Sequence, residues 1–349
     1  MKILLLAGED SGVMYAEELK AHLAGHEVRG YRDYGFKTED LAVMGVGQVL
    51  KRLFFFLGVK RTMMRAIDEW RPDVVCTIDY PGMNLKLAAY AKSMGIRTVH
   101  VVCPQVWAWK RGRIPKIEAS LDRLCCFFPF EPRLFRPGFA TFVGHPLADA
   151  FGGRGESVER GLVAVLPGSR IGEIELILPT LLEATKNLNC RLAIPAANDR
   201  AYETIRRIAG DGVEVTRGGA RELLKRADCA AVASGTATLE AALARCPTVL
   251  VYRVGWLFAF LARRFIRGVR HIGLANIIAE KAFVPCPMPE LLQEAFTAGA
   301  VCAQLERWLT DSSARAEAVA RLDATMKLLQ SDGCAMDRIA KEVVNGVLQ

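Results

Sequence analysis

The sequence predicts an α/β protein with two parallel, doubly wound sheets, each in its own domain. Apolar runs typical of strands alternate with helix-like segments along the chain, and this order favours parallel sheets. The runs are continuously apolar, as in strands that are covered on both faces. A Gly-rich polar segment, FGGRGESVE at 151–159, interrupts the pattern and indicates a domain boundary.

The boundary separates an N-terminal domain, 1–155, from a C-terminal domain, 156–329. The chain has 349 residues, of which 51% are apolar, enough for two separate cores. A final helical segment at about 330–349 is predicted to pack back on the first domain or on a partner chain. We expect the carboxyl ends of both sheets to border one central cleft.

The individual elements follow from the same patterns. Strands are predicted at 3–7, 74–78, 98–102, 124–128, 163–166, 191–194, 229–233 and 248–252. Helical periodicity is clear at 17–23, 84–93 and 221–225. The first apolar run is too short for a signal peptide, and the longest runs fall far short of the ~20 residues that span a bilayer. A soluble or peripheral protein is therefore expected.

The net charge and the cysteine content limit the kinds of ligand and site that the chain can have. The net charge of +8 is small and dispersed, which argues against nucleic acid and favours phosphate or anionic lipid. None of the ten cysteines forms a CxxC pair. This usage is typical of a reduced cytosolic protein with buried thiols, so we expect neither a disulfide framework nor a metal site.

Two strand–turn–helix segments of the second half suit a phosphate. LPGSR at 166–170 offers Gly168 for close approach of the backbone, Ser169 as a cap for a helix that begins near Ile171, and Arg170 for a bidentate grip. A helix start adds free N–H groups and a positive dipole end. The alternative is an ordinary capped turn with a solvated Arg170.

ASGTATLE at 233–240 is the second such turn. Hydroxyl and N–H groups of Ser234, Gly235, Thr236 and Thr238 are natural phosphate ligands, and Glu240 is placed to accept ribose hydroxyls. Packing of small residues at a helix start is the alternative. The two turns together predict a site for a nucleotide diphosphate.

Asp79 follows the buried strand 74–78 and precedes Tyr80-Pro81. A carboxylate at the carboxyl end of a parallel strand points to the ligand-binding edge of the sheet. Such a group can accept the proton of an attacking hydroxyl in a group-transfer reaction. Capping of the next turn or helix is the other interpretation.

Motifs along nearly the whole chain resemble the lipid-A-disaccharide synthase family. They include GEDSG at 8–12, IDYPGMN at 78–84, PQVWAWKRGRIPKI at 104–117, VGHPLAD at 143–149 and LANIIA at 274–279. The resemblance implies a GT-B glycosyltransferase that joins UDP-diacylglucosamine to diacylglucosamine 1-phosphate with inversion. It implies no metal or cofactor, since the UDP-sugar is a substrate. It also implies a site at the cytoplasmic face of the inner membrane, and a homodimer through the C-terminal helices as one arrangement.

The resemblance also assigns site residues. It makes Asp79 the catalytic base, and Arg170 the group that stabilises the leaving UDP. It places Asn276 beside the nucleotide, with helix capping as the alternative. The acceptor-binding residues that it implies are Glu9, Ser11, Gly12, Asn84, Trp107 and His145, for each of which a capping or core position is the alternative. Asp10, Val13, Gly82 and Met83 depart from the family pattern.

Two mixed apolar and basic stretches suit a membrane surface. In the first, 49–65, the predicted contacts are Phe54, Phe55, Phe56, Lys60 and Arg61. The second is 256–270, with four arginines. Such segments match anionic leaflets and acylated substrates, although burial in a core explains the phenylalanines equally well.

Two other functions fit parts of the sequence. A UDP-sugar epimerase or another GT-B relative would share the C-terminal nucleotide site without explaining VWAW or GHPLAD. A diverged homologue that binds lipid or nucleotide without turnover is the non-enzymatic alternative. Retention of Asp79, Arg170 and Glu240 argues against it.

Overall fold

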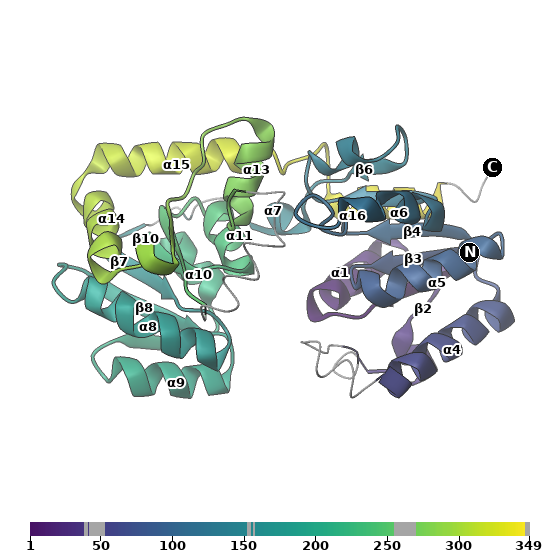
Figure 1. Ribbon diagram of the computed structural model, residues 1–349, viewed down its shortest axis with the longest axis horizontal. Coiled ribbons are helices and arrows are strands. Elements are labelled where there is room, and N and C mark those ends of the chain that lie inside the picture. The colour runs from purple at the N-terminus through teal and green to yellow at the C-terminus, as the bar shows by residue number, and fades with distance from the viewer. Residues whose placement is uncertain (38–40, 42–52, 152–154, 156–157, 255–269, 346–349) are drawn as a thin grey trace. The chain divides into compact units, whose positions relative to one another are not determined.

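The computed structural model describes residues 1–37, 41, 53–151, 155, 158–254 and 270–345. The chain forms two compact units, one of Met1–Pro146 with Ser331–Gln349 and one of Leu147–Gln330 (Figure 1). Each unit has a six-stranded sheet in which all paired strands are parallel. The predicted α/β class with two parallel sheets is therefore confirmed.

The first unit has the strand order β2-β1-β3-β4-β5-β6. Its strands are β1 Lys2–Ala7, β2 Glu27–Arg29, β3 Val74–Ile78, β4 Arg97–Val101, β5 Arg123–Cys126 and β6 Ala140–Phe142. Its helices are α1 Asp10–His22, α4 Leu53–Trp70, α5 Pro81–Ser93, α6 Ile114–Ser120 and α16 Ala335–Val344, with short 3₁₀ turns η1 Tyr31–Tyr34, η2 Arg111–Arg113 and η3 Glu131–Leu134.

Helices cover both faces of this sheet. Ile3 and Leu5 of β1 pack on one face with α1 and α16. Leu4 and Leu6 pack on the other face with α4 and α5. Because successive side chains of a strand point to opposite faces, a strand buried on both sides must be apolar throughout, which explains the continuous apolar runs.

The second unit has the order β12-β11-β10-β7-β8-β9. Its strands are β7 Glu159–Leu166, β8 Arg191–Ala196, β9 Glu214–Arg217, β10 Ala227–Ala233, β11 Thr248–Tyr252 and β12 Glu290–Leu292. Its helices are α7 Pro146–Phe151, α8 Ile171–Thr185, α9 Asp199–Ala209, α10 Ala220–Arg226, α11 Thr236–Leu243, α13 Leu274–Ala282, α14 Ala298–Thr310 and α15 Ser312–Lys327, with the 3₁₀ turn η4 Gln293–Ala295. The main core lies between the sheet and α8, α9 and α14.

Both sheets have a switch point, where the chain turns from building one side of the sheet to building the other. In the first sheet it lies between β1 and β3, and in the second between β7 and β10. Loops that leave neighbouring strands there diverge to opposite faces and leave room for a ligand at the carboxyl ends. These loops are GEDSG and DYPGMN in the first unit, and PGSR and SGT in the second.

Helix α16 belongs to the first unit, although the whole second unit precedes it in sequence. Its residues Met336, Ile339 and Val343 are buried in the core on the α1 side of the sheet. Gly144 allows the close approach of the segment that leads to it, because a Cβ there would lie 2.4 Å from Ser331 Oγ.

Candidate active site

A pocket of about 320 Å³ lies at the switch point of the second sheet. Loops that follow β7, β8, β9 and β10 line it. Six of the predicted nucleotide-binding residues are among the lining residues: Gly168, Ser169, Ser234, Gly235, Thr236 and Glu240. Two segments about sixty-five residues apart in sequence thus meet at one pocket.

Two helix N-termini border this pocket. Helix α8 begins at Ile171 and α11 begins at Thr236, each directly after a lining turn. The first N–H groups of a helix have no partner within the helix, and its N-terminal end is positive. The pocket therefore offers backbone donors to an anion from two sides.

Gly168 is required by the backbone of the first turn. Its φ is +110°, and a Cβ there would lie 2.8 Å from Glu173 Oε2. Only glycine adopts this conformation without strain. The prediction that Ser169 caps α8 is wrong: Arg170 occupies the N-cap position, and no side chain caps the helix. Ser169 instead lines the pocket.

Arg170 stands beside the pocket rather than in its lining. Its Nη1 lies 3.1 Å from Glu173 Oε1, and its side chain is 63% exposed. Glu173 does line the pocket. An exposed pair of this kind contributes little to stability, so the guanidinium can exchange Glu173 for a stronger anion at small cost.

Thr238 and Glu240 differ in position. Thr238 is fully buried, and its Oγ1 donates to Gly235 O at 2.8 Å, so it holds the turn and is not among the lining residues. Glu240 lines the pocket, and burial raises the pKa of its carboxyl while Arg221 opposes the shift. The carboxyl of Glu240 thus offers hydrogen-bond acceptors to hydroxyl groups of a ligand in this pocket.

Asp79 lies at the switch point of the first sheet, directly after β3. Asp79 and Tyr80 both have left-handed backbones, with φ of 49° and 50°. Such conformations cost about 1–3 kcal/mol each and persist only where the surroundings enforce them. Here Asp79 N donates to Val101 O at 2.9 Å, and Asp79 Oδ1 accepts from Tyr80 N at 2.9 Å.

Burial raises the pKa of Asp79, and the hydrogen bond from Tyr80 N only partly offsets it. A carboxyl with a raised pKa is a stronger base once it is ionised. The loop that follows β1 packs against Tyr80, since a Cβ on Gly8 would lie 2.5 Å from the Tyr80 ring. Glu9 and Ser11 of that loop are exposed at the same edge, and Glu9 makes no capping hydrogen bond.

Gly12 and Asn84 pack against the backbone at the carboxyl end of β3, beside Asp79. Gly12 is buried, and a Cβ there would lie 3.3 Å from Ile78 O. Asn84 is fully buried: its Nδ2 donates to Asp79 O at 2.8 Å and Ile78 O at 3.1 Å, and its Oδ1 accepts from Tyr31. Both ends of the amide are thus occupied. The prediction that Asn84 contacts the acceptor is corrected: the residue holds the Asp79 turn.

Trp107 and His145 also lie in the core. Trp107 is 6% exposed, and its Nε1 donates to Glu131 Oε1 at 3.0 Å. His145 is 5% exposed against Phe127 and Phe128, and burial lowers its pKa to about 4. Their burial agrees with the core position that the sequence left open for both residues, and contact with the acceptor stays a prediction. In the same PQVWAW segment, Trp109 is exposed, with Lys110 over its ring.

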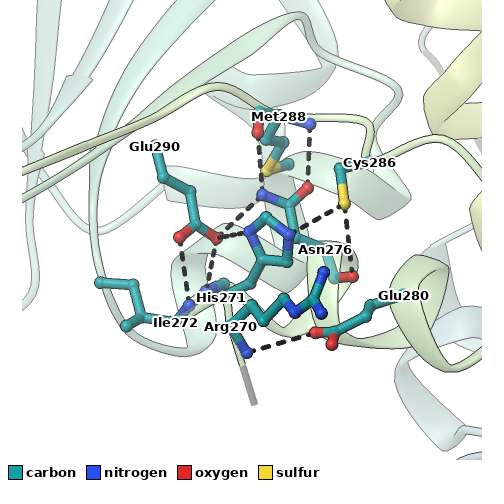
Figure 2. Close-up of polar contacts among 9 residues, drawn as sticks. Arg270, His271, Ile272, Asn276, Glu280, Cys286, Met288 and Glu290 are labelled. Atoms are coloured by element: carbon teal, nitrogen blue, oxygen red, sulfur yellow. Dashed lines mark hydrogen bonds and ion pairs between the residues drawn. The ribbon is translucent and has the colours of Figure 1, made fainter. Parts of the chain in front are cut away.

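Asn276 is not among the residues that line the pocket, and it does not cap α13. Figure 2 shows its polar contacts instead. It is fully buried, and its amide bonds Met288 N and O at 3.0 and 2.8 Å and Glu290 Oε1 at 2.8 Å. Glu290 in turn accepts from Gly273 N at 3.0 Å. Asn276 therefore joins α13 to the start of β12, and this geometry provides no direct contact with a nucleotide.

One group of described residues could hold a metal ion. Cys103, Cys126 and Glu131 lie buried in the first unit with their ligand atoms within 4.8 Å of one another. Glu131 is already hydrogen-bonded to Trp107 and to Phe128 N at 3.1 Å. None of these three residues is among those that line the 320 Å³ pocket.

Sequence reasoning overlooked the other walls of the pocket. Glu173 and the turns Pro195–Ala197 and Gly218–Ala220 contribute to the lining. The strand at 191–194 was predicted, so its carboxyl end could have been placed beside that of the preceding strand, β7. The turn after β9 carried no such signal, because β9 itself lacks an apolar run.

A family model described as lipid-A-disaccharide synthetase matches residues 3–344. The lipid-A-disaccharide synthase of Anaeromyxobacter dehalogenans strain 2CP-C is 35% identical, with 100% of this chain and 98% of that protein covered. That of Syntrophus aciditrophicus strain SB is 36% identical, with 87% of each covered. Among solved structures, Acinetobacter baumannii MurG is similar with a TM-score of 0.63 at 14% identity, covering 99% of this chain and 100% of that one. The calicheamicin glycosyltransferase CalG4 gives 0.59 at 16%, covering 100% and 98%.

Two parallel α/β units of this topology, one with a phosphate-suited pocket at its switch point, give the chain the GT-B fold that it shares with MurG and CalG4. The protein is a hexosyltransferase. The match over nearly its whole length shows that the chain belongs to the lipid-A-disaccharide synthase family, which places it in lipid A disaccharide synthesis.

Proposed function

We propose that the protein joins UDP-2,3-diacylglucosamine to 2,3-diacylglucosamine 1-phosphate, with inversion at the anomeric carbon. The products are lipid A disaccharide 1-phosphate and UDP. The observation that carries the proposal is the position of Asp79: a carboxyl with a raised pKa, held in a strained turn at the switch point of the first sheet. The family of the chain supports this choice of reaction.

Asp79 acts as the general base in this mechanism. Its carboxylate accepts the proton of the acceptor hydroxyl while the hydroxyl oxygen attacks the anomeric carbon. The bond from that carbon to the diphosphate oxygen breaks, and UDP leaves with the electron pair. Attack on the face opposite the leaving group inverts the configuration. Base catalysis of this kind contributes about 10²–10⁴-fold to a rate.

The 320 Å³ pocket holds the UDP portion in this proposal. The N-termini of α8 and α11 and the hydroxyls of Ser169, Ser234 and Thr236 bind the diphosphate, and Glu240 accepts the ribose hydroxyls. Arg170 turns from Glu173 to the leaving phosphate and offsets its developing charge. We propose that this cation and the two helix dipoles perform the task that a metal ion performs in other transferases.

We also propose that the protein works on the inner membrane surface at its cytoplasmic face, where acylated substrates reside. Helix α4 supports this, since Phe54 and Leu57 are 87% and 43% exposed and Arg61 and Arg65 continue the same exposed stripe. Phe55 and Phe56 are half-buried and pack against the core, and their contact with lipid stays a prediction. Lys60 is half-buried. Of the second predicted membrane stretch, 256–270, all residues except Arg270 lie outside the described residues. A homodimer through the C-terminal helices stays a prediction.

The test measures UDP release from UDP-2,3-diacylglucosamine, with and without diacylglucosamine 1-phosphate, in detergent with EDTA. We expect release that requires the acceptor and survives EDTA. In Asp79→Asn, turnover should fall by about 10²–10⁴-fold. UDP affinity should not change, because the pocket belongs to the other unit.

Three outcomes would contradict parts of the proposal. Turnover of Asp79→Asn close to that of the wild type would exclude Asp79 as the base. Loss of activity in EDTA, with recovery on adding Mg²⁺, would exclude the metal-independent mechanism. A folded wild-type protein that binds UDP without releasing it from the sugar donor would favour the diverged, non-catalytic homologue.

A further inference from the structure

The first unit contains a cavity of about 450 Å³ whose lining is mainly polar. Arg97 and Arg123, the first residues of β4 and β5, contribute to its lining. Because all strands of this sheet run parallel, these amino ends lie at the opposite end of the sheet from Asp79. The cavity is therefore separate from the catalytic edge.

Helix α16 closes the cavity with its polar face. Arg338, Lys341, Glu342 and Asn345 all line it. Their spacing of three, four and seven positions places them on one face of the helix. The opposite face carries the buried residues that dock α16 on the sheet. The cavity thus exists only when the C-terminal segment has packed against strands about 245 positions earlier.

The lining carries an excess of positive charge. Four cationic side chains, Arg97, Arg123, Arg338 and Lys341, face one carboxylate, Glu342. Glu342 Oε2 lies 3.8 Å from Arg123 Nε, at the long end of the range for an ion pair. Like charges that line one cavity repel one another, and an anion between them offsets this repulsion.

The hydrogen bonds of these groups are incomplete. Arg338 Nη2 donates to Phe142 O at 3.1 Å, and Arg97 Nη2 donates to Glu342 O at 3.0 Å. Arg97 Nε is buried and finds no acceptor within the described part of the chain. Lys341 is exposed and forms no ion pair with any described residue. A buried guanidinium N–H without an acceptor is the feature expected where an anion or water completes the site.

We infer that this cavity binds an anion that carries a phosphate group. Guanidinium groups bind phosphate oxygens through paired hydrogen bonds, and the exposed Lys341 adds a further positive charge to the lining. A bound phosphate would accept from Arg97 Nε and offset the repulsion among the four cations. It would also tie α16 to β4 and β5, so binding stabilises the folded first unit. The phosphate could belong to a small free anion or to a phosphomonoester lipid headgroup.

The test uses Lys341→Glu, which leaves the contacts of the three arginines intact. Lys86→Glu is the matched control, because Lys86 is an exposed lysine on α5 of the same unit that does not line the cavity. Inorganic phosphate is titrated into each protein by calorimetry, with chloride at equal ionic strength as the blank. In a second arm, each protein is floated with phosphatidylcholine vesicles that contain or lack phosphatidic acid.

We expect Lys341→Glu to weaken binding by about tenfold or more, since it replaces an attraction with a repulsion, while Lys86→Glu changes it less than about twofold. This pattern in the calorimetric arm identifies a small free phosphate as the ligand. The same pattern confined to phosphatidic acid vesicles identifies a headgroup. The inference is overturned if neither probe binds the wild-type protein, or if the two variants weaken binding equally. Thermal unfolding of both variants checks that the first unit is folded.

Discussion

Burial raises the pKa of two carboxyl groups of the first unit, with different consequences. Asp79 is partly buried at the edge of the sheet, where a substrate can reach it. Glu131 is 2% exposed, and burial raises its pKa to about 8 despite hydrogen bonds from Trp107 and Phe128 N. The first shift suits a base, whereas the second makes the stability of the fold depend on pH.

The sign of the Glu131 effect follows from its raised pKa. The folded state holds the Glu131 proton more tightly than the unfolded chain, whose pKa is about 4.5. This contribution to stability is fully present below pH 4.5 and is lost as the pH rises through about 8. We expect the free energy of unfolding of the wild type, relative to Glu131→Gln, to fall over this range by on the order of 5 kcal/mol.

Urea denaturation at several pH values between 4.5 and 8.5 measures this difference. Glu18→Gln is the matched control, because Glu18 is an exposed glutamate of the same unit. Its stability relative to the wild type should stay nearly constant across the range. A difference between wild type and Glu131→Gln that is constant, or that grows with pH, would contradict the protonated, buried state of Glu131.

At the scale of elements, α4 shows how one helix divides an aromatic run between core and surface. Phe55 contacts Phe36 and Phe56 edge-on, with ring centroids 6.3 and 5.4 Å apart. Phe54 lies one position earlier, which is about 100° around the helix, and is exposed. The three phenylalanines at 54–56 therefore do not share one environment. Their positions around the helix place Phe54 at the surface and the other two against the core.

We predict that Phe54→Ser with Leu57→Ser lowers flotation with anionic vesicles several-fold, because both apolar side chains of the exposed stripe are lost. Phe283→Ser is the control, since Phe283 is 93% exposed but belongs to the second unit. An equal loss in the control would indicate nonspecific hydrophobic binding to the vesicles rather than contact through α4. No loss in the double variant, with helical content unchanged, would remove α4 from the membrane contact.

The strands that local sequence patterns predict occupy different places in the sheets from those that they do not predict. All eight predicted strands are present, and they are the four central strands of each sheet. The four that sequence reasoning missed, β2, β6, β9 and β12, are the edge strands. They have three or four residues and no continuous buried run. An edge strand has one neighbour, so little of its sequence must be apolar.

At the scale of the whole molecule, the first unit is completed by a segment that follows the second. Removing packing from α16 should therefore destabilise the first unit alone. We expect Ile339→Ala to cost about 2–5 kcal/mol there, because Ile339 is 1% exposed in the core between α16 and the sheet. Leu305→Ala, at a fully buried position of α14, is the counterpart in the second unit.

Scanning calorimetry with and without UDP separates the two effects. UDP should raise the unfolding temperature of the second unit, which holds the pocket, and so identify its transition. Ile339→Ala should lower the other transition and Leu305→Ala the UDP-sensitive one. If both variants lower the same single transition by equal amounts, the two units unfold as one cooperative body.

The sequence by itself determined the α/β class, the central strands, and the loops at both switch points, including Asp79 and the residues that meet at the pocket. These features depend on local periodicity and on motifs within a few residues, which one stretch of chain encodes. Only the tertiary structure decided which polar residues of those motifs are buried: Asn84, Trp107, His145 and Asn276 hold the fold together. It alone brought Arg97 and Arg123 to the polar face of α16. Burial and pairing across such separations depend on how whole elements pack, and no local pattern specifies that.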